Sequence, residues 1–141
     1  MSLSTHVLDA ALGRPAAGMP IRLEVLDPAA AGGAGGWRLL AETRTDRDGR
    51  ARDAFAAAWP AGASEGAAAP SGETPGGARD GADDTRAYRL VFDTAGYFAG
   101  QGVKEFFYPE VVVCFTVADP GAHHHVPLLL SPFAYSTYRG S

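Results

Sequence analysis

The feature that most constrains the fold of this chain is an alternation of apolar and polar residues in short runs bounded by turn residues. In residues 20–27, positions 21, 23 and 25 are apolar and are separated by Arg22 and Glu24. In residues 37–45, the apolar positions are 37, 39 and 41. Successive side chains of a β-strand point to opposite faces, so each run predicts a strand with its apolar face toward a core and its charged face toward solvent. Comparable runs cover residues 3–9, 88–93, 111–118, 123–130 and 134–138.

Seven or eight short strands with turn signals between them predict an all-β chain, folded as a two-sheet antiparallel sandwich. Residues 93–101 depart from the period of two. They offer Asp93 and Thr94 as N-caps and predict one short helix, the only helix expected. The run at 111–118 is apolar on both faces, which predicts a central or interface-buried strand with Cys114 as a small buried residue.

The length of 141 residues and the 46% hydrophobic content suit a single domain over residues 1–141. Residues 60–87 break every periodicity and consist mostly of Gly, Ala and Pro with scattered charges. Such a composition buries too little apolar surface to offset the entropy lost on ordering. We therefore predict a disordered insertion here and not a domain boundary.

Charge and hydropathy limit the partners. A net charge of −4 disfavours nucleic acid, so a small molecule is the expected partner. No apolar run approaches the roughly 20 residues that span a bilayer, and the N-terminus lacks the pattern of a signal peptide. The single Cys114 excludes an intrachain disulfide and fits a reducing compartment, so a cytoplasmic location is expected.

Reactive side chains are concentrated in residues 123–141. If residues 123–130 are extended, His123 and His125 point one way, whereas His124 and the apolar residues after it point the other way. Ser131-Pro132 predicts a turn, after which residues 134–138 return as a second strand. The strand therefore presents an imidazole face and an apolar face.

Two segments of this region resemble the C-terminal signature of the transthyretin-like 5-hydroxyisourate hydrolases. They are His-x-His-Val-Pro-Leu-Leu-Leu-Ser at residues 123–131 and Tyr-Arg-Gly-Ser at residues 138–141. The chain has His124 where this family usually has Tyr, and Ala134 where it usually has Gly. Neither departure falls on a position that the family uses for chemistry, although its connection corresponding to residues 60–87 is usually much shorter.

Two further motifs are similar to the same family. Ser-Thr-His-Val-Leu-Asp at residues 4–9 resembles its N-terminal motif, in which the His is catalytic, so the resemblance assigns that role to His6. Asp9 is expected to shape the turn that follows. Thr-Asp-Arg-Asp-Gly-Arg at residues 45–50 predicts a tight turn into another strand that continues toward Phe55 and Trp59. The family uses the Arg after this Gly to bind substrate, which implicates Arg50.

The resemblance implies a prealbumin-like fold and a homotetramer with active sites in channels between subunits. It implies hydrolysis of the purine-derived 5-hydroxyisourate by water attack on a ring amide carbonyl, without a metal or cofactor. The implied catalytic residues are His6, Arg50, His125 and Ser141. The implied substrate-binding residues are Arg50, His123, Tyr138, Arg139, Gly140 and Ser141. Either His6 or His125 would serve as the base, because imidazole is largely neutral near its ordinary pKa of about 6.5.

Two other functions are compatible with these residues. A transthyretin-type carrier would use the same sandwich to bind an apolar ligand without turnover, although such a ligand gains little from two histidines and Arg50. A metal site would use His123 and His125, at alternate positions of one strand, with His6 as a third ligand. Without the motifs, the three consecutive histidines would simply form a polar edge of a sheet.

Overall fold

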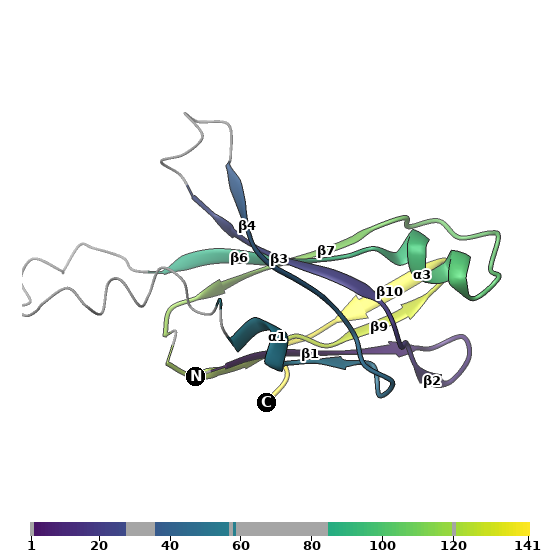
Figure 1. Ribbon diagram of the computed structural model, residues 1–141, viewed down its shortest axis with the longest axis horizontal. Helices are drawn as coiled ribbons and strands as arrows, with labels where there is room; N and C mark the ends of the chain where they lie inside the picture. The colour runs from purple at the N-terminus through teal and green to yellow at the C-terminus, as the bar shows by residue number, and fades with distance from the viewer. Residues whose placement is uncertain (1, 28–35, 57, 59–84, 120) are drawn as a thin grey trace, which may run out of the picture.

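The computed structural model describes residues 2–27, 36–56, 58, 85–119 and 121–141, and over these residues the chain forms two β-sheets packed face to face (Figure 1). The strands are β1 (Ser2–Asp9), β2 (Arg14–Pro15), β3 (Pro20–Leu26), β4 (Trp37–Arg44), β5 (Arg50–Ala51), β6 (Arg86–Phe92), β7 (Val111–Val117), β8 (His123–His125), β9 (Leu128–Ser131) and β10 (Ala134–Thr137). The helices are α1 (Asp53–Ala56) and α3 (Thr94–Gly100). The predicted all-β sandwich is confirmed.

The first sheet is built around β1. Strands β8 and β9 pair with β1 in parallel, β2 and β5 pair with it antiparallel, and β10 pairs antiparallel with β9. The parallel pairs differ from the fully antiparallel sandwich expected. The predicted strand 123–130 is in fact two strands, β8 and β9, which are separated by Val126-Pro127 and both run parallel to β1.

The second sheet has the order β4-β3-β6-β7 and is antiparallel throughout. Its inner face and the alternate residues of β1 and β9 enclose the core. The buried apolar side chains include Leu3, Val7, Ile21, Leu23, Val25, Tyr88, Leu90, Phe92, Phe98, Val111, Leu128 and Leu130. The predicted alternation therefore holds for β1 and β9, where each buried position follows the previous one by two residues, and for the apolar residues of β3, Ile21, Leu23 and Val25.

The alternation predicted for β4 is wrong in its middle. The register against β3 shifts at a bulge, so that Leu23 pairs with Ala41 but Glu24 pairs with Leu39. Leu40 is the extra residue, and such a residue reverses the facing of the side chains beyond it. Leu39 is consequently 50% exposed, whereas Leu40 packs against the core.

The position predicted for the 111–118 strand is also wrong in part. β7 is an edge strand in the described part of the sheet, and its outward side chains include Val112, which is 40% exposed, and the free thiol of Cys114, which is exposed. The central position is therefore wrong, whereas burial of this strand in an interface stays a prediction.

Glu24 was expected to face solvent but is only 9% exposed. Its carboxylate accepts hydrogen bonds from Arg89 Nε at 2.6 Å and Arg22 Nε at 3.1 Å. Burial by itself would raise the pKa of Glu24, but the two guanidinium partners outweigh it and hold this pKa below its ordinary value. On the outer face of β3, Glu24 is thus covered by its ion pairs with Arg22 of the same strand and Arg89 of β6.

The helix predicted at residues 93–101 is confirmed as α3, with Asp93 as N-cap accepting from Gly96 N at 3.0 Å. A second short helix, α1, was not expected, because residues after Arg50 were predicted to remain extended. β5 is only two residues long. Phe55 belongs to α1 and is fully buried in the core. Trp59 lies outside the described residues, as does the part of the predicted insertion before residue 85. β6 begins at Arg86, inside the predicted bounds of that insertion.

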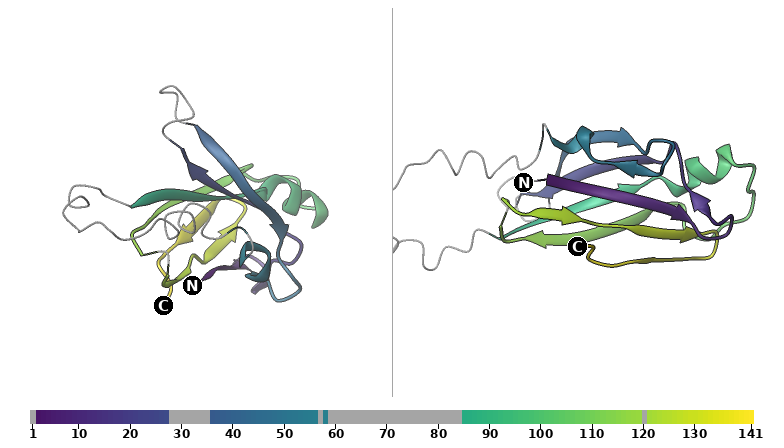
Figure 2. Two further views of the ribbon diagram at one scale, coloured as in Figure 1. Left: turned by 60° about the vertical axis from the view of Figure 1, so that its left-hand side comes forward. Right: turned by 90° about the horizontal axis from the view of Figure 1, so that it is seen from below.

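Asp9 shapes the turn after β1, as expected, because its Oδ1 accepts the backbone N–H groups of Ala11 and Leu12. Its Oδ2 accepts from the Tyr97 hydroxyl at 2.7 Å, which ties this turn to α3. The N- and C-termini lie together at the opposite end of the sandwich from α3 (Figure 2). Neither helix of the described part is long and apolar enough to cross a membrane.

Candidate active site

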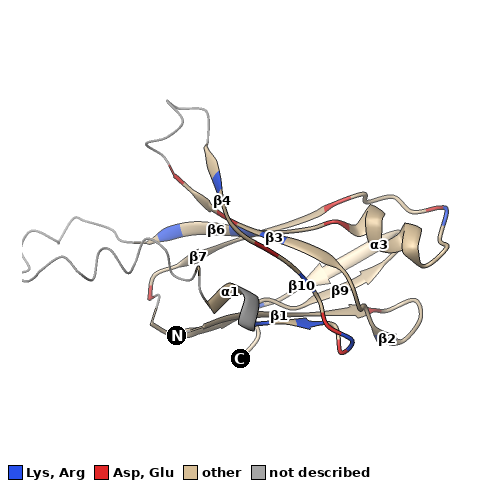
Figure 3. Ribbon diagram, viewed as in Figure 1, with Lys and Arg blue, Asp and Glu red and all other residues tan. Residues whose placement is uncertain are grey.

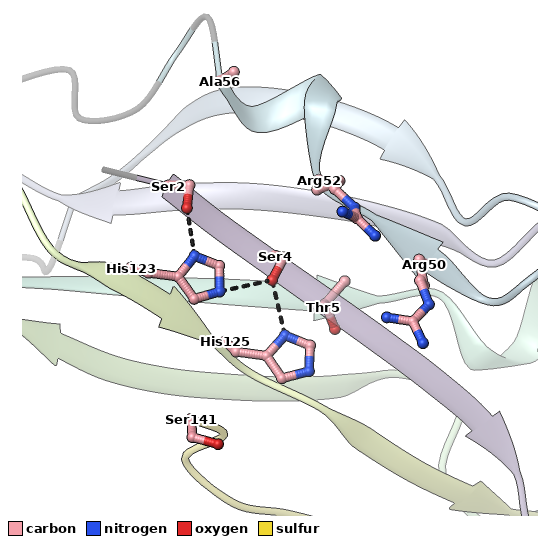
Figure 4. A pocket seen from close by; sticks show the side chains of 9 residues that line it. All are labelled: Ser2, Ser4, Thr5, Arg50, Arg52, Ala56, His123, His125 and Ser141. Carbon is pink, nitrogen blue, oxygen red and sulfur yellow. Dashed lines mark hydrogen bonds between the residues drawn. The ribbon is translucent and has the colours of Figure 1, made fainter.

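A cleft of about 380 Å³ opens on the outer face of the first sheet, close to both termini (Figure 4). The opposite face of β1 is in the core, where Leu3, Thr5 and Val7 are buried. The residues that line the cleft are Ser2, Ser4, Thr5, Arg50, Arg52, Ala56, His123, His125 and Ser141. Four residues predicted for the site therefore line one cleft: Arg50, His123, His125 and Ser141.

Strand register brings these residues together. In the parallel pair of β1 and β8, Ser2 is opposite His123 and Ser4 is opposite His125. On the other side of β1, His6 is opposite Arg50 of β5. Side chains opposite each other in a ladder share a face, so three strands present one row of serines and histidines with Arg50 at its edge.

The turn before Arg50 is held by hydrogen bonds between the Asp46 side chain and backbone N–H groups of the turn. Asp46 Oδ1 accepts the N–H groups of Asp48 at 2.8 Å and Arg50 at 3.0 Å. The Arg50 N–H group in particular keeps the pKa of Asp46 below its ordinary value. Gly49 has φ +76°, and a Cβ there would lie 2.5 Å from the Val7 carbonyl oxygen. Only glycine fits, and the predicted Asp-Gly turn directs Arg50 toward the cleft.

His125 is the most constrained histidine of the cleft. Its Nδ1 lies 2.8 Å from Ser4 Oγ, and its ring stacks on that of His123 with centroids 6.3 Å apart and planes 13° apart. Burial lowers the pKa of His125, and electrostatic interactions with His123, His6 and Arg50 lower it further. The ring is therefore neutral at physiological pH and able to accept a proton.

The C-terminal tail closes one side of the cleft. Gly140 N–H donates to the His125 carbonyl at 2.9 Å in an isolated antiparallel bridge, and Ser141 lines the cleft beyond it. Tyr138 is 60% exposed, and neither Tyr138 nor Arg139 lines the cleft. His6 does not line it either, although it lies opposite Arg50 and its charge acts on His125.

The contact between the tail and His125 gives a testable prediction. A Cβ on Gly140 would lie 2.4 Å from His125 Cδ2 and 3.0 Å from its Cγ, so Gly140→Ala forces the ring or the tail to move. Since 1 Å of misplacement costs about a hundredfold in rate, we expect Gly140→Ala to lower kcat by roughly 10–100-fold with little loss of thermal stability. Gly121→Ala, where a Cβ would meet only the Asp119 carboxylate oxygen at 3.3 Å, is the control. Wild-type kcat in Gly140→Ala would contradict this placement of the tail.

The alternative of a metal site gains no support from this geometry. Among the described residues, no group of three His, Cys, Asp or Glu side chains is arranged to hold a metal ion. His123 and His125 instead direct ring nitrogens to the hydroxyls of Ser2 and Ser4.

Comparison with known proteins identifies the family. The model of the HIUase/transthyretin family matches residues 3–140, almost the whole chain. The chain belongs to this family. Among its curated members, the 5-hydroxyisourate hydrolase of Caulobacter vibrioides is 40% identical over 142 residues, covering 99% of this chain and 97% of the relative. The 5-hydroxyisourate hydrolase of Mus musculus is 39% identical over 139 residues, covering 99% and 94%.

Two solved structures of the HIUase/transthyretin family show that its fold alone does not decide function. Klebsiella pneumoniae 5-hydroxyisourate hydrolase superposes with a TM-score of 0.65 at 26% identity, covering 99% of this chain and 98% of that one. Transthyretin from Sparus aurata superposes with a TM-score of 0.68 at 26% identity, covering 98% and 95%. Proteins with both names share the sandwich, so the side chains in the cleft must carry the functional argument.

Sequence reasoning missed four polar residues that this member of the family places in the cleft: Ser2, Ser4, Thr5 and Arg52. A signal for three of them was present in the alternation. Ser4 shares the face of β1 with His6, as does Ser2, and Arg52 is two residues after Arg50. Thr5 faces inward, and its hydroxyl donates to the buried Val126 carbonyl at 2.6 Å. This hydrogen bond ties β1 to the segment between β8 and β9.

Proposed function

We propose that this chain hydrolyses 5-hydroxyisourate to 2-oxo-4-hydroxy-4-carboxy-5-ureidoimidazoline, a step of urate degradation. The observation that carries the proposal is the convergence of His123, His125, Arg50 and Ser141 on one cleft. The full-length similarity to relatives named 5-hydroxyisourate hydrolase supports the same reaction. A further relative, the uric acid degradation bifunctional protein TTL of Arabidopsis thaliana, is 36% identical over 148 residues, although this chain spans only 37% of that protein.

Ring opening of a cyclic amide needs a base for the attacking water and donors for the oxyanion that develops on the carbonyl. His125 supplies the base, because its lowered pKa keeps it neutral and able to take the proton of water. Arg50 supplies the donors, because its planar guanidinium binds two oxygens of a ring at once. The reaction requires no metal or cofactor.

The remaining site residues complete the pocket. His6, opposite Arg50 on β1, contacts the substrate or water from the far side, and His123 binds the ring beside His125. Ser141 positions the water through a hydrogen bond from the tail that Gly140 anchors. Tyr138 and Arg139 are exposed next to this tail and extend the binding surface.

A carrier function predicts a different outcome in a direct assay. Urate oxidase generates 5-hydroxyisourate from urate in the cuvette, and its absorbance is then followed as it decays. We expect a catalytic amount of the chain to accelerate the decay through many turnovers. A carrier would retain at most one ligand per site, so decay at the buffer rate with catalytic amounts of protein would refute hydrolysis.

We also propose that the active form is a homotetramer with the clefts facing channels between subunits. The cleft is lined by residues of β1, β5 and β8, and its Arg50, His123 and Ser141 are exposed to solvent in a single chain. The edge strand β10 is exposed along its length, which leaves it available for pairing. We expect light scattering to give four times the monomer mass of 14.6 kDa. A monomer with full activity would refute the assembly.

We place the reaction in the cytoplasm with a purine-derived small molecule as the partner. The free, exposed Cys114 fits a reducing compartment. In Figure 3 the Lys and Arg residues of the described part of the chain are distributed over several elements, with Asp and Glu among them. Such a surface suits neither nucleic acid nor an anionic membrane.

A further inference from the structure

Four side chains of the cleft form one continuous hydrogen-bonded row of two hydroxyls and two imidazoles (Figure 4). Ser2 Oγ is hydrogen-bonded to His123 Nδ1, and His123 Nε2 lies 3.5 Å from Ser4 Oγ. Ser4 Oγ lies 2.8 Å from His125 Nδ1. The row therefore runs Ser2, His123, Ser4, His125, and it ends at the base of the proposed reaction.

The hydrogens of such a row can be arranged cooperatively in only two ways. A neutral imidazole donates from one nitrogen and accepts at the other, and a hydroxyl donates one hydrogen while it accepts another. In the first arrangement, His125 donates from Nδ1 to Ser4, which donates to His123, which donates to Ser2. In the second arrangement every hydrogen bond is reversed, and His125 carries its hydrogen on Nε2.

The charges around His125 favour the first arrangement. Arg50 of β5 acts on the ring as a fixed positive group, and it carries N–H donors but no acceptor. Figure 4 shows the second ring nitrogen of His125 on the edge of the ring away from Ser4, and Arg50 lines the same cleft. A lone pair on Nε2 is stabilised by this positive field, whereas an N–H group there would be opposed by it.

We propose that Ser4 is a positioning residue that holds neutral His125 in its Nδ1–H tautomer, with the Nε2 lone pair toward the cleft, and that His123 and Ser2 complete a proton relay behind it. The inference rests on the proposed function, in which Nε2 accepts the proton of water. Without Ser4, the Nδ1–H group loses its side-chain hydrogen-bond acceptor and the Nδ1–H tautomer is stabilised less, whereas the Nε2–H form presents no lone pair to the cleft.

The relay also accounts for where the charge goes during the reaction. Water loses a proton to His125 Nε2, which breaks an O–H bond and forms an N–H bond. The Nδ1 proton then passes to Ser4 Oγ, and the Ser4 hydroxyl proton passes to His123 Nε2. No other reactant is needed. The positive charge moves from the ring beside Arg50 to His123, which is exposed and solvated.

The tautomer is measured directly by ¹⁵N NMR of the full chain labelled at histidine, since the ring nitrogens of a neutral imidazole differ in shift according to which carries hydrogen. The His125 signals are assigned by their loss in His125→Gln. We expect wild-type neutral His125 to carry hydrogen on Nδ1, and Ser4→Ala to shift it toward Nε2–H. Ser4→Thr keeps a hydroxyl and should retain the wild-type tautomer. Ser136→Ala, an exposed serine of β10 outside the cleft, is the control.

Kinetics provide the second measurement. General-base catalysis contributes about 10²–10⁴-fold, so a partial loss of the competent tautomer should lower kcat of Ser4→Ala by about tenfold with little change in KM. Ser4→Thr should recover most of this loss. Ser2→Ala, at the far end of the relay, should shift the tautomer less than Ser4→Ala does.

Neutral wild-type His125 with hydrogen on Nε2 would overturn the proposal, and so would a tautomer unchanged in a folded Ser4→Ala. The wild-type measurement stands by itself if Ser4→Ala fails to fold. The proposed function fails separately: wild type would then leave 5-hydroxyisourate decay at the buffer rate, whatever its tautomer. If wild type turns over 5-hydroxyisourate but His125 has the same tautomer in wild type and Ser4→Ala, only the positioning role of Ser4 is refuted.

Discussion

Replacing His125 by Gln should lower kcat for 5-hydroxyisourate by about 10²–10⁴-fold, the range that a general base contributes. Glutamine is close to imidazole in size and polarity but cannot take a proton at neutral pH, so the variant removes the base while largely keeping the packing against His123. The decay of 5-hydroxyisourate with purified wild type and variant, at matched protein concentration, measures the effect.

The neighbouring residue provides the matched control for His125→Gln. His124 is on the other side of the same strand, where its Nδ1 lies 3.1 Å from the Ala122 carbonyl oxygen. His124→Tyr introduces the residue that the resembling hydrolases usually have, and we expect wild-type rates from it. Equal losses in both variants would show that β8 is needed only for folding. An active His125→Gln would remove His125 as the base.

The pH profile of the wild type tests the same role without a substitution. Burial lowers the pKa of His125 below the ordinary value of 6.5, and electrostatic interactions with His123, His6 and Arg50 lower it further. The base works when neutral, so the rate is full above this lowered pKa and falls as the pH drops through it. We expect the midpoint of the acid limb of kcat/KM below pH 6.5, and a midpoint above 6.5 would contradict the environment described for His125.

Replacing Arg50 by Met should lower kcat/KM by about 10²–10³-fold, the loss seen when one donor to a developing oxyanion is removed. Arg50→Lys keeps the charge but not the planar pair of donors, so we expect it to recover only part of the activity. Arg47→Met is the control, because Arg47 is an exposed residue of the same turn that does not line the cleft. Wild-type kcat/KM in Arg50→Met would exclude Arg50 from substrate binding.

Arg50→Met should also change the acid limb of the pH profile. Arg50 lowers the pKa of His125 by charge repulsion, so its removal lets that pKa rise. The midpoint of kcat/KM should therefore move to higher pH in Arg50→Met and remain near its wild-type position in Arg50→Lys. An unchanged midpoint in Arg50→Met would show that the two side chains do not interact.

Local signals in the sequence were sufficient for most of the sandwich. Alternating residues identified β1, β3, β4, β6, β9 and β10, Asp93 predicted the start of α3, and the Asp-Gly pair predicted the turn before Arg50. These features depend on neighbours a few residues apart, which is the range over which periodicity and turn chemistry act. The motifs at both ends also led to the family.

Features that depend on distant residues were not predictable in this way. The bulge at Leu40 arises from pairing with β3, and the exposure of Cys114 arises because β7 is at the edge of its sheet. The ladder of Ser2 and Ser4 against His123 and His125 needs β8 to run parallel to β1, although more than a hundred residues separate them in the chain. Alternation states which face a side chain occupies but not which strand lies beside it.

Adjacent residues were sufficient to predict most of the strands, the imidazole face of residues 123–125 and the family motifs, because each of these features is local in the chain. The environment that favours His125 as the base of the proposed reaction could be seen only in the folded chain, because its burial, its hydrogen bond to Ser4 and its proximity to Arg50 come from three separate strands. A pKa and a tautomer depend on what surrounds a ring in space, and those surroundings exist only after β1, β5 and β8 have assembled.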